Sequence, residues 1–171
     1  MEEIFFEGLA LEKLQILCAK RLPSMRAIHV EDADNIRYYC ASNGRVLAVF
    51  EEVNPSGGKL KEPVNLVLGS KIKKYASGFK VKPVDDNIIV LSSAEENICA
   101  DLEERFVSNW RSLLPTDKAK PAEKYCFVSP RDLALAAKFV DIEKTPLDLG
   151  NALCWKFGLW TVVVVKSGKR E

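Results

Sequence analysis

Histidine is almost absent from the sequence, and cysteine pairs of the Cys-x-x-Cys type are missing altogether. The single histidine, His29, lies in an alternating segment and has no nucleophile with which it can be paired, so a general base is not indicated. The five cysteines are odd in number and widely spaced, which predicts reduced, mostly buried thiols and no zinc site. They are Cys18, Cys40, Cys99, Cys126 and Cys154. We therefore predict a protein that is not an enzyme and that holds no metal or cofactor.

The sequence also has no large excess of positive or negative charge, since it contains 25 Lys and Arg residues and 24 Asp and Glu residues and its net charge is +1. No overall field therefore attracts nucleic acid, and any basic surface must be local. Long apolar runs are absent too, because the longest, residues 159–165, is too short to span a membrane. The amino terminus, MEEIFFEGLA, begins with two acids, the wrong sign for a secretory signal. These absences predict no membrane association and a cytoplasmic location.

The apolar residues that are present predict two copies of a β-α-β-β-β pattern within residues 2–105. Leu11, Leu14 and Leu17 repeat at helical spacing before Pro23, and Ser42-Asn43-Gly44 is a strong hairpin signal. The first copy comprises a strand at 4–7, a helix at 9–22 and strands at 26–31, 35–42 and 45–53, with a turn at Asp32-Ala33-Asp34. The second copy comprises a strand at 64–68, a helix at 71–77 and strands at 80–84, 87–92 and 97–105.

A third, shorter unit follows a polar connector with apolar anchors at Trp110, Leu113 and Leu114. For this unit the sequence predicts a strand at 125–128, a helix at 130–140 with Ser129 as N-cap, and a hairpin of strands at 152–157 and 159–166. This unit is one strand short of the others. The sequence thus predicts an α+β protein with helices on one face of antiparallel sheets. Its parts are a complete domain at 1–105, a connector at 106–123 and a partial second domain at 124–171.

Two stretches of the chain resemble the bacterial DNA polymerase III beta subunit, the DNA sliding clamp. Residues 42–49, SNGRVLAV, resemble the family's hairpin Thr-Asp-Gly-His-Arg-Leu-Ala-Val. Residues 104–115, ERFVSNWRSLLP, are similar to its connector Gly-Arg-Phe-Pro-Asp-Tyr-Arg-Arg-Val-Leu-Pro. With the doubled pattern and IFFEGLALEKLQIL at the start, the resemblance covers about residues 2–139 and implies the clamp fold of the family's second domain and the start of its third. The family closes a ring from pairs of longer chains, which a monomer of this chain cannot do.

The resemblance implies basic helices that hold duplex DNA loosely by its phosphates, without reading sequence. In the third predicted helix, Leu133, Ala136, Ala137 and Val140 form an apolar stripe, and two cations point to the other side. The DNA-binding residues predicted in this way are Lys13, Lys20, Lys73, Lys74, Arg131 and Lys138. The alternative interpretation is that these cations are simply the solvated face of amphipathic helices.

The resemblance also implies a hydrophobic groove between the Gly44 hairpin and the connector, where clamp partners insert a short linear peptide. The residues predicted to form it are Met25, Ser42, Gly44, Val46, Leu47 and Leu113. The alternative is that the aliphatic residues belong to the core, because the far wall of the family's groove lies in a part that this chain lacks.

The final predicted strand, LWTVVVV, is β-branched without alternation, so it needs cover on both faces or a partner along its edge. Since its unit is one strand short, we predict homo-oligomerisation through sheet edges. Two functions follow. The first is a sliding-clamp-like, non-catalytic protein of replication or repair that binds duplex DNA non-specifically as an oligomer. The alternative is a clamp-fold interaction module, or a phage or mobile-element decoy, that binds replication proteins and not DNA.

Overall fold

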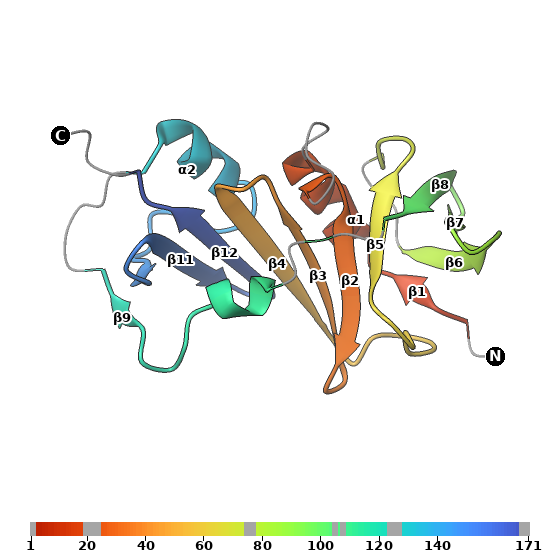
Figure 1. Ribbon diagram of the computed structural model, residues 1–171, viewed down its shortest axis with the longest axis horizontal. Helices are drawn as coiled ribbons and strands as arrows, with labels where there is room; N and C mark the ends of the chain where they lie inside the picture. The colour runs from red at the N-terminus through yellow and green to blue at the C-terminus, as the bar shows by residue number, and fades with distance from the viewer. Residues whose placement is uncertain are drawn as a thin grey trace.

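The computed structural model describes residues 3–18, 25–73, 78–103, 106, 109–122 and 128–167. Their strands form one antiparallel sheet of 12 strands in the order β1-β6-β7-β8-β5-β2-β3-β4-β12-β11-β10-β9. Helices α1 and α2 lie on the same side of this sheet, and the short helix η3 lies on the other (Figure 1). This arrangement confirms the predicted α+β class with helices on one face.

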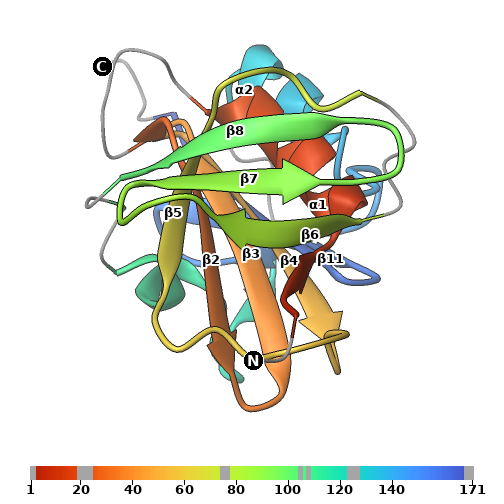
Figure 2. The same cartoon turned by 90° about the vertical axis from the view of Figure 1, so that its right-hand side faces the viewer.

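The elements of the first half are β1 (Phe5–Phe6), α1 (Gly8–Leu14), the 3-10 helix η1 (Gln15–Leu17), β2 (Ile28–Ala33), β3 (Ile36–Ser42), β4 (Val46–Val53), β5 (Val64–Leu68), β6 (Phe79–Pro83), β7 (Ile88–Ser92) and β8 (Asn97–Leu102). Seen from the side, strands β6, β7 and β8 cross in front of β2, β3 and β4, so the sheet is strongly twisted along its length (Figure 2). The predicted strands of both copies are confirmed, with small differences at their ends.

The elements of the second half are η3 (Trp110–Leu113), β9 (Lys120–Pro121), α2 (Pro130–Ala136), β10 (Leu147–Asp148), β11 (Ala152–Phe157) and β12 (Trp160–Val165). The predicted hairpin of the last two strands is confirmed. Strands β9 and β10 were not predicted. The predicted strand at 125–128 lies outside the described residues except for Val128, which is not in a strand. The division into two domains stays a prediction.

All three predicted helices differ from the structure, and the third, predicted at 130–140, ends at Ala136. The first ends at Leu14 and continues only as η1, and residues 19–24 lie outside the described residues. The second is wrong for residues 71–73, which are not helical, while residues 74–77 are not described. A reason is visible at Ile72, whose backbone N–H and carbonyl both bond to the amide of Gln15, at 3.0 and 3.2 Å. In a helix at 71–77 the Ile72 carbonyl would accept from the N–H four residues later, so its bond from Gln15 takes the place of an intrahelical one, whereas the N–H of Ile72 would have no partner inside the helix.

The turn between β2 and β3 begins two residues later than predicted and has two residues instead of three. Asp34 and Asn35 occupy it with φ of 51° and 62°, so β2 runs on to Ala33. Positive φ at both central positions is the type I′ hairpin conformation, which Asp and Asn tolerate better than Ala does.

Strand β12 lies between β4 and β11, and this pairing corrects the prediction of an open edge at residues 159–166. Trp160, Val162 and Val164 face the helices, whereas Val163 faces the opposite side, where it packs in a second cluster with Trp110. Both faces of β12 are covered, which explains its lack of alternation. Among the described residues the sheet ends instead at the two-residue strands β1 and β9.

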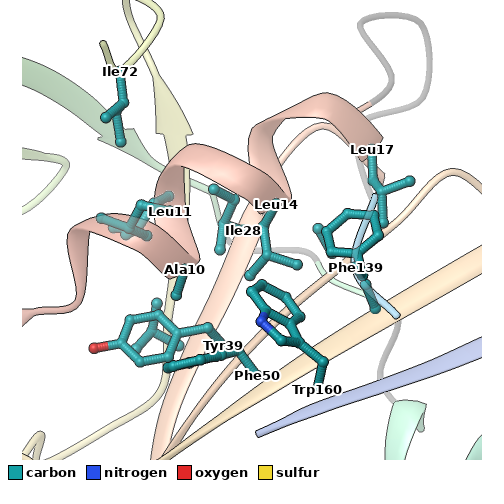
Figure 3. Packing of buried hydrophobic residues seen from close by; sticks show 14 of the residues in the cluster. Ala10, Leu11, Leu14, Leu17, Ile28, Tyr39, Phe50, Ile72, Phe139 and Trp160 are labelled. Carbon is teal, nitrogen blue, oxygen red and sulfur yellow. The ribbon is translucent and has the colours of Figure 1, made fainter. Parts of the chain in front are cut away.

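A large core fills the space between the helices and the sheet. Leu11 and Leu14 of α1 pack against Tyr39 and Phe50, and Trp160 links that group to Phe139 (Figure 3). The cluster draws on strands from both halves of the chain, so β4 and β12 belong to one continuous packed layer. The smaller cluster on the other face lies beneath η3, and the candidate site forms beside it.

Candidate functional site

A groove with a cavity volume of about 430 Å³ lies beside the ends of β4 and β12. Four segments line it: residues 42–47 of the hairpin between β3 and β4, residues of the connector between 112 and 119, residues between 148 and 152, and two valines of β12. Five of the six residues predicted for a peptide groove are among them, namely Ser42, Gly44, Val46, Leu47 and Leu113.

The hairpin wall is shaped by side chains that bond to its own backbone. Gly44 has a φ of 87°, and its N–H donates to the hydroxyl of Ser42 at 3.0 Å. The carbonyl oxygen of the Asn43 side chain accepts from the N–H groups of Arg45 and Val46, at 3.0 and 2.8 Å. These bonds satisfy the turn and leave its outer surface open to the groove.

Met25, the sixth predicted residue, does not line the groove. Its Cε and Sδ atoms lie 3.1 and 3.2 Å from the position that a Cβ on Gly44 would take. A side chain at position 44 would therefore be strained by its φ and crowded by the thioether as well. Met25 supports the turn from behind.

The connector wall is held in place by aromatic and charged contacts on the face that carries η3. Trp110 is buried, and the guanidinium of Arg111 lies 4.4 Å from the ring centre of Tyr38 and 4.6 Å from that of Trp110. Arg111 Nε also donates to the carboxylate of Glu31 at 2.9 Å. The segment is thus fixed at Trp110 and Arg111, and Leu113 reaches the groove with 46% of its surface exposed.

Glu31 connects this wall to the sheet. Burial alone would raise the pKa of its carboxyl, but hydrogen bonds from His29 and Arg111 outweigh burial and lower the pKa. His29 Nε2 lies 2.9 Å from Glu31, Nδ1 lies 2.7 Å from the side-chain oxygen of Asn65, and the ring stacks on Phe106 at 4.8 Å. The only histidine of the chain is therefore a structural residue beneath the connector.

The far wall of the groove comes from the last strands of this chain and the residues next to them. Leu149 directly follows β10, Ala152 is the first residue of β11, and Val163 and Val165 belong to β12. Leu149 was not predicted, because residues 141–151 have no local strand signal and were predicted as loop. Val46 and Leu47 are buried, at 0% and 4% exposure, so they serve as core and as groove floor at once.

Three charged side chains line the groove: Arg45, Lys118 and Asp148. Asp148 accepts from Lys166 Nζ at 2.6 Å and from the Gly150 N–H at 2.7 Å, and these bonds lower the pKa of its carboxyl. Arg45 Nε donates at 2.7 Å to Asp132, a buried carboxylate of α2. No prediction had assigned these charges to the site.

The predicted DNA-binding residues do not form one group in the described structure. Arg131 and Lys138 are exposed, as predicted, and line a second cavity of about 400 Å³ between η1 and α2. Lys13 is half-buried with its Nζ 5.6 Å from the Trp160 ring centre. Lys73 is exposed but not on a helix, and Lys20 and Lys74 lie outside the described residues. Ala137, predicted in the apolar stripe, is exposed because α2 ends at Ala136.

In the part of the chain that the structure describes, no three His, Cys, Asp or Glu residues gather as metal ligands would. Four cysteines are free thiols there, and Cys126 lies outside it. Within the same residues, no helix combines the length and the apolar character needed to cross a membrane.

No family model and no curated protein matches the sequence. Solved structures do match. The DNA polymerase III beta chain of Streptococcus pneumoniae is similar at a TM-score of 0.69 and 10% identity, over 100% of this chain and 66% of that one. The chain has the bacterial sliding-clamp fold.

Two further clamps have the same similarity. The sliding clamp of Bacillus subtilis matches at a TM-score of 0.68 and 9% identity, over 99% of this chain and 66% of that one. The Helicobacter pylori beta clamp in complex with 5-chloroisatin matches at 0.71 and 11%, over 99% of this chain and 64% of that one. The chain thus spans slightly less than two thirds of the length of these clamps. The clamp resemblance found in the hairpin and the connector is confirmed at the level of the fold.

Proposed function

We propose that this protein is a non-catalytic, clamp-fold interaction protein whose groove holds a short linear peptide of a replication protein. The observation that carries the proposal is that five of six residues chosen from the clamp resemblance line one cavity. Those residues come from the hairpin and the connector, which are about 70 positions apart in the sequence. A fold-level likeness does not by itself require that they meet at a groove.

The groove has the size and surface of a peptide site. Its volume of about 430 Å³ is in the range of small-ligand pockets, which is enough for a few side chains of a peptide. Leu47 and Val163 form an apolar floor, and Leu113 and Val165 keep 46% and 38% of their surfaces exposed at its rim. Exposed aliphatic side chains around a hollow are typical of surfaces that bind an apolar anchor.

The test compares two leucines of equal exposure. Leu113→Asp places a charge in the groove, whereas Leu159→Asp places the same charge on a leucine that is 48% exposed and not in the groove. We expect wild type and Leu159→Asp to retain the same replication proteins from a bacterial lysate, identified by mass spectrometry, and Leu113→Asp to lose them. Synthetic segments of those proteins should then bind wild type with a loss of at least about tenfold in Leu113→Asp. Equal binding by the two variants would overturn the proposal.

Duplex DNA is the second candidate partner, and exposed cations on the helix side favour it. Arg131 and Lys138 project from the α2 region beside the second cavity. DNA bound through phosphates alone should be sequence-blind and should weaken steeply with salt. Changing both residues to Glu should lower duplex affinity, whereas Lys61→Glu, at an exposed loop position, should lower it less. Unchanged affinity in the double variant would remove the helix side as a DNA surface.

Self-association through sheet edges stays a prediction. The strand that motivated it, β12, is paired on both sides, so the candidate edges among the described residues are β1 and β9. Each of them has two residues, and β9 contains Pro121; short edges and proline oppose strand pairing between molecules. The mass in solution, with and without circular duplex DNA, decides whether an oligomer or a ring forms.

A further inference from the structure

The positive and negative side chains at the groove rim are not equal in number. Arg45 keeps 51% of its side chain exposed and uses Nε for Asp132. Its Nη2 lies 3.4 Å from the Ser167 hydroxyl, and its Nη1 has no hydrogen-bond partner among the described residues. Lys118 is exposed and makes no ion pair within the same part of the chain. The rim therefore presents two cations with unused donors.

The one acid that lines the groove is already neutralised. Asp148 is held by Lys166 and by the Gly150 N–H, so its charge is compensated within the protein. Asp117 is exposed next to Lys118 in the chain, but it neither lines the groove nor pairs with that lysine among the described contacts. Arg45 is compensated by Asp132 in the same way, so an anionic ligand meets one uncompensated cation, Lys118, together with the unused N–H donors of Arg45, and no uncompensated carboxylate on the lining.

The same groove has an apolar floor, which separates the candidate anions. A nucleic-acid backbone presents phosphates and sugars, and it has no aliphatic group to place against Leu47, Val163 and Leu113. A peptide with aliphatic side chains between acidic ones satisfies both the floor and the rim. Free phosphate satisfies the rim only.

From this combination we infer that the groove selects acidic peptides, with aliphatic side chains on the floor and carboxylates against Arg45 and Lys118. This inference rests on the proposed function, because it names the chemistry of the peptide that the groove takes. Arg45 has a fixed position, since the buried carboxylate of Asp132 holds its Nε. Its remaining donors can engage a carboxylate without breaking that bond.

Three labelled peptides with one apolar centre test the inference: EELALLEE, QQLALLQQ and KKLALLKK. By fluorescence polarisation at low salt, we expect the acidic peptide to bind more tightly than the glutamine peptide, because its carboxylates pair with the rim cations. The gain should be limited to about tenfold, because each of these ion pairs is partly exposed to water. The lysine peptide should bind most weakly, and added salt should reduce the differences. Equal affinity of the acidic and glutamine peptides would overturn the charge selection and leave the peptide groove intact.

Variants assign the effect to the rim. Lys118→Gln should reduce the preference for the acidic peptide about threefold, whereas Lys61→Gln, which removes the same charge from an exposed position off the groove, should leave it unchanged. Arg45→Lys keeps the charge opposite Asp132, so it should preserve the fold and part of the preference. An equal response of Lys118→Gln and Lys61→Gln would mean that net charge, not the rim, sets the preference, and would overturn the inference.

Two further outcomes separate the proposals. If none of the three peptides binds, or if Leu113→Asp leaves their binding unchanged, the peptide groove itself is wrong. If unlabelled duplex DNA displaces the acidic peptide from wild type but not from Lys118→Gln, the rim is a phosphate site and the acidic-peptide inference is wrong.

Discussion

Glu31 and Asp32 are neighbours in β2, and each carboxylate is paired with an arginine, but the two pairs lie on opposite faces of the sheet. Asp32 faces the helix side, where it binds Arg37 through Nε and Nη2 at 2.7 and 2.8 Å. Glu31 faces the connector side, where it binds Arg111. Because side chains alternate along a strand, adjacent residues serve different parts of the molecule.

The two pairs differ in burial and in what they join. Arg37 is fully buried, and its guanidinium also donates to the carbonyl oxygens of Phe5 and Gly58. It therefore ties β1 and a loop to the sheet. Arg111 keeps 46% of its side chain exposed and joins the connector to β2 through Glu31 and to β3 through Tyr38. The buried pair stabilises the fold, whereas the exposed pair positions one wall of the groove.

The largest expected effect is on the helix side. Arg37→Met leaves Asp32 without its buried partner and two carbonyl groups without a donor, so the free energy of unfolding should fall by about 3–5 kcal/mol. Urea denaturation followed by circular dichroism measures this. Adding Asp32→Asn should recover part of the loss, because it removes the uncompensated charge. A fall of less than about 1 kcal/mol in the single variant would mean that the two faces do not differ in this way.

A smaller loss of stability with a larger loss of binding is expected on the connector side. Arg111→Ala removes an exposed ion pair and two ring contacts, which should cost about 1 kcal/mol of unfolding free energy. The affinity for a groove peptide should fall about tenfold, because Leu113 is no longer held at the wall. Faster hydrogen exchange at the Ser112 and Leu114 amides reports the loosened connector independently of any ligand.

Arg111→Lys is the matched control, since it keeps the charge but not the planar stacking. Unchanged exchange in Arg111→Ala would contradict the assigned role.

The features that sequence could predict are those with a local signal. The hairpin at Ser42-Asn43-Gly44 contains Asn-Gly, a strong short-range hairpin signal, and the clamp resemblance was carried by that hairpin and by the connector. The strands were found because alternation and turn residues mark them along the chain. Five residues of the groove followed from these two segments.

The features that were missed depend on contacts between distant parts of the chain. The residues of β12 contain no signal that identifies the strand with which it pairs. Its pairing with β4, about 110 positions away, could therefore not be predicted from its own residues. The far wall at Leu149 and the rim charge at Asp148 followed from that pairing and were missed with it. The helix at 71–77 was predicted from capping residues alone, and the side chain of Gln15 overrides that signal at Ile72.

Acid should weaken both carboxylate pairs, with the smallest effect at Glu31. Burial raises the pKa of each carboxyl, but hydrogen bonds from Arg37 to Asp32, and from His29 and Arg111 to Glu31, outweigh it, so both pKa values are lowered on folding. A lowered pKa adds stability that is complete above the pKa of the unfolded chain and is lost as pH falls through the pKa of the folded one. For Glu31 the loss should be less than about 1 kcal/mol, because its partner is exposed.

The measurement is the difference in unfolding free energy between wild type and Glu31→Gln, followed from neutral pH into the acid range. At neutral pH wild type should be more stable, and the difference should shrink toward zero as Glu31 becomes protonated. Asp32→Asn should show the same course with a larger starting difference, because Arg37 has no access to water and depends on that carboxylate. If Glu31→Gln and Asp32→Asn lower the unfolding free energy equally at neutral pH, the greater burial of the Asp32–Arg37 pair does not make it the more stabilising one. A constant difference across the range would instead show that Glu31 acts through its shape and not its charge.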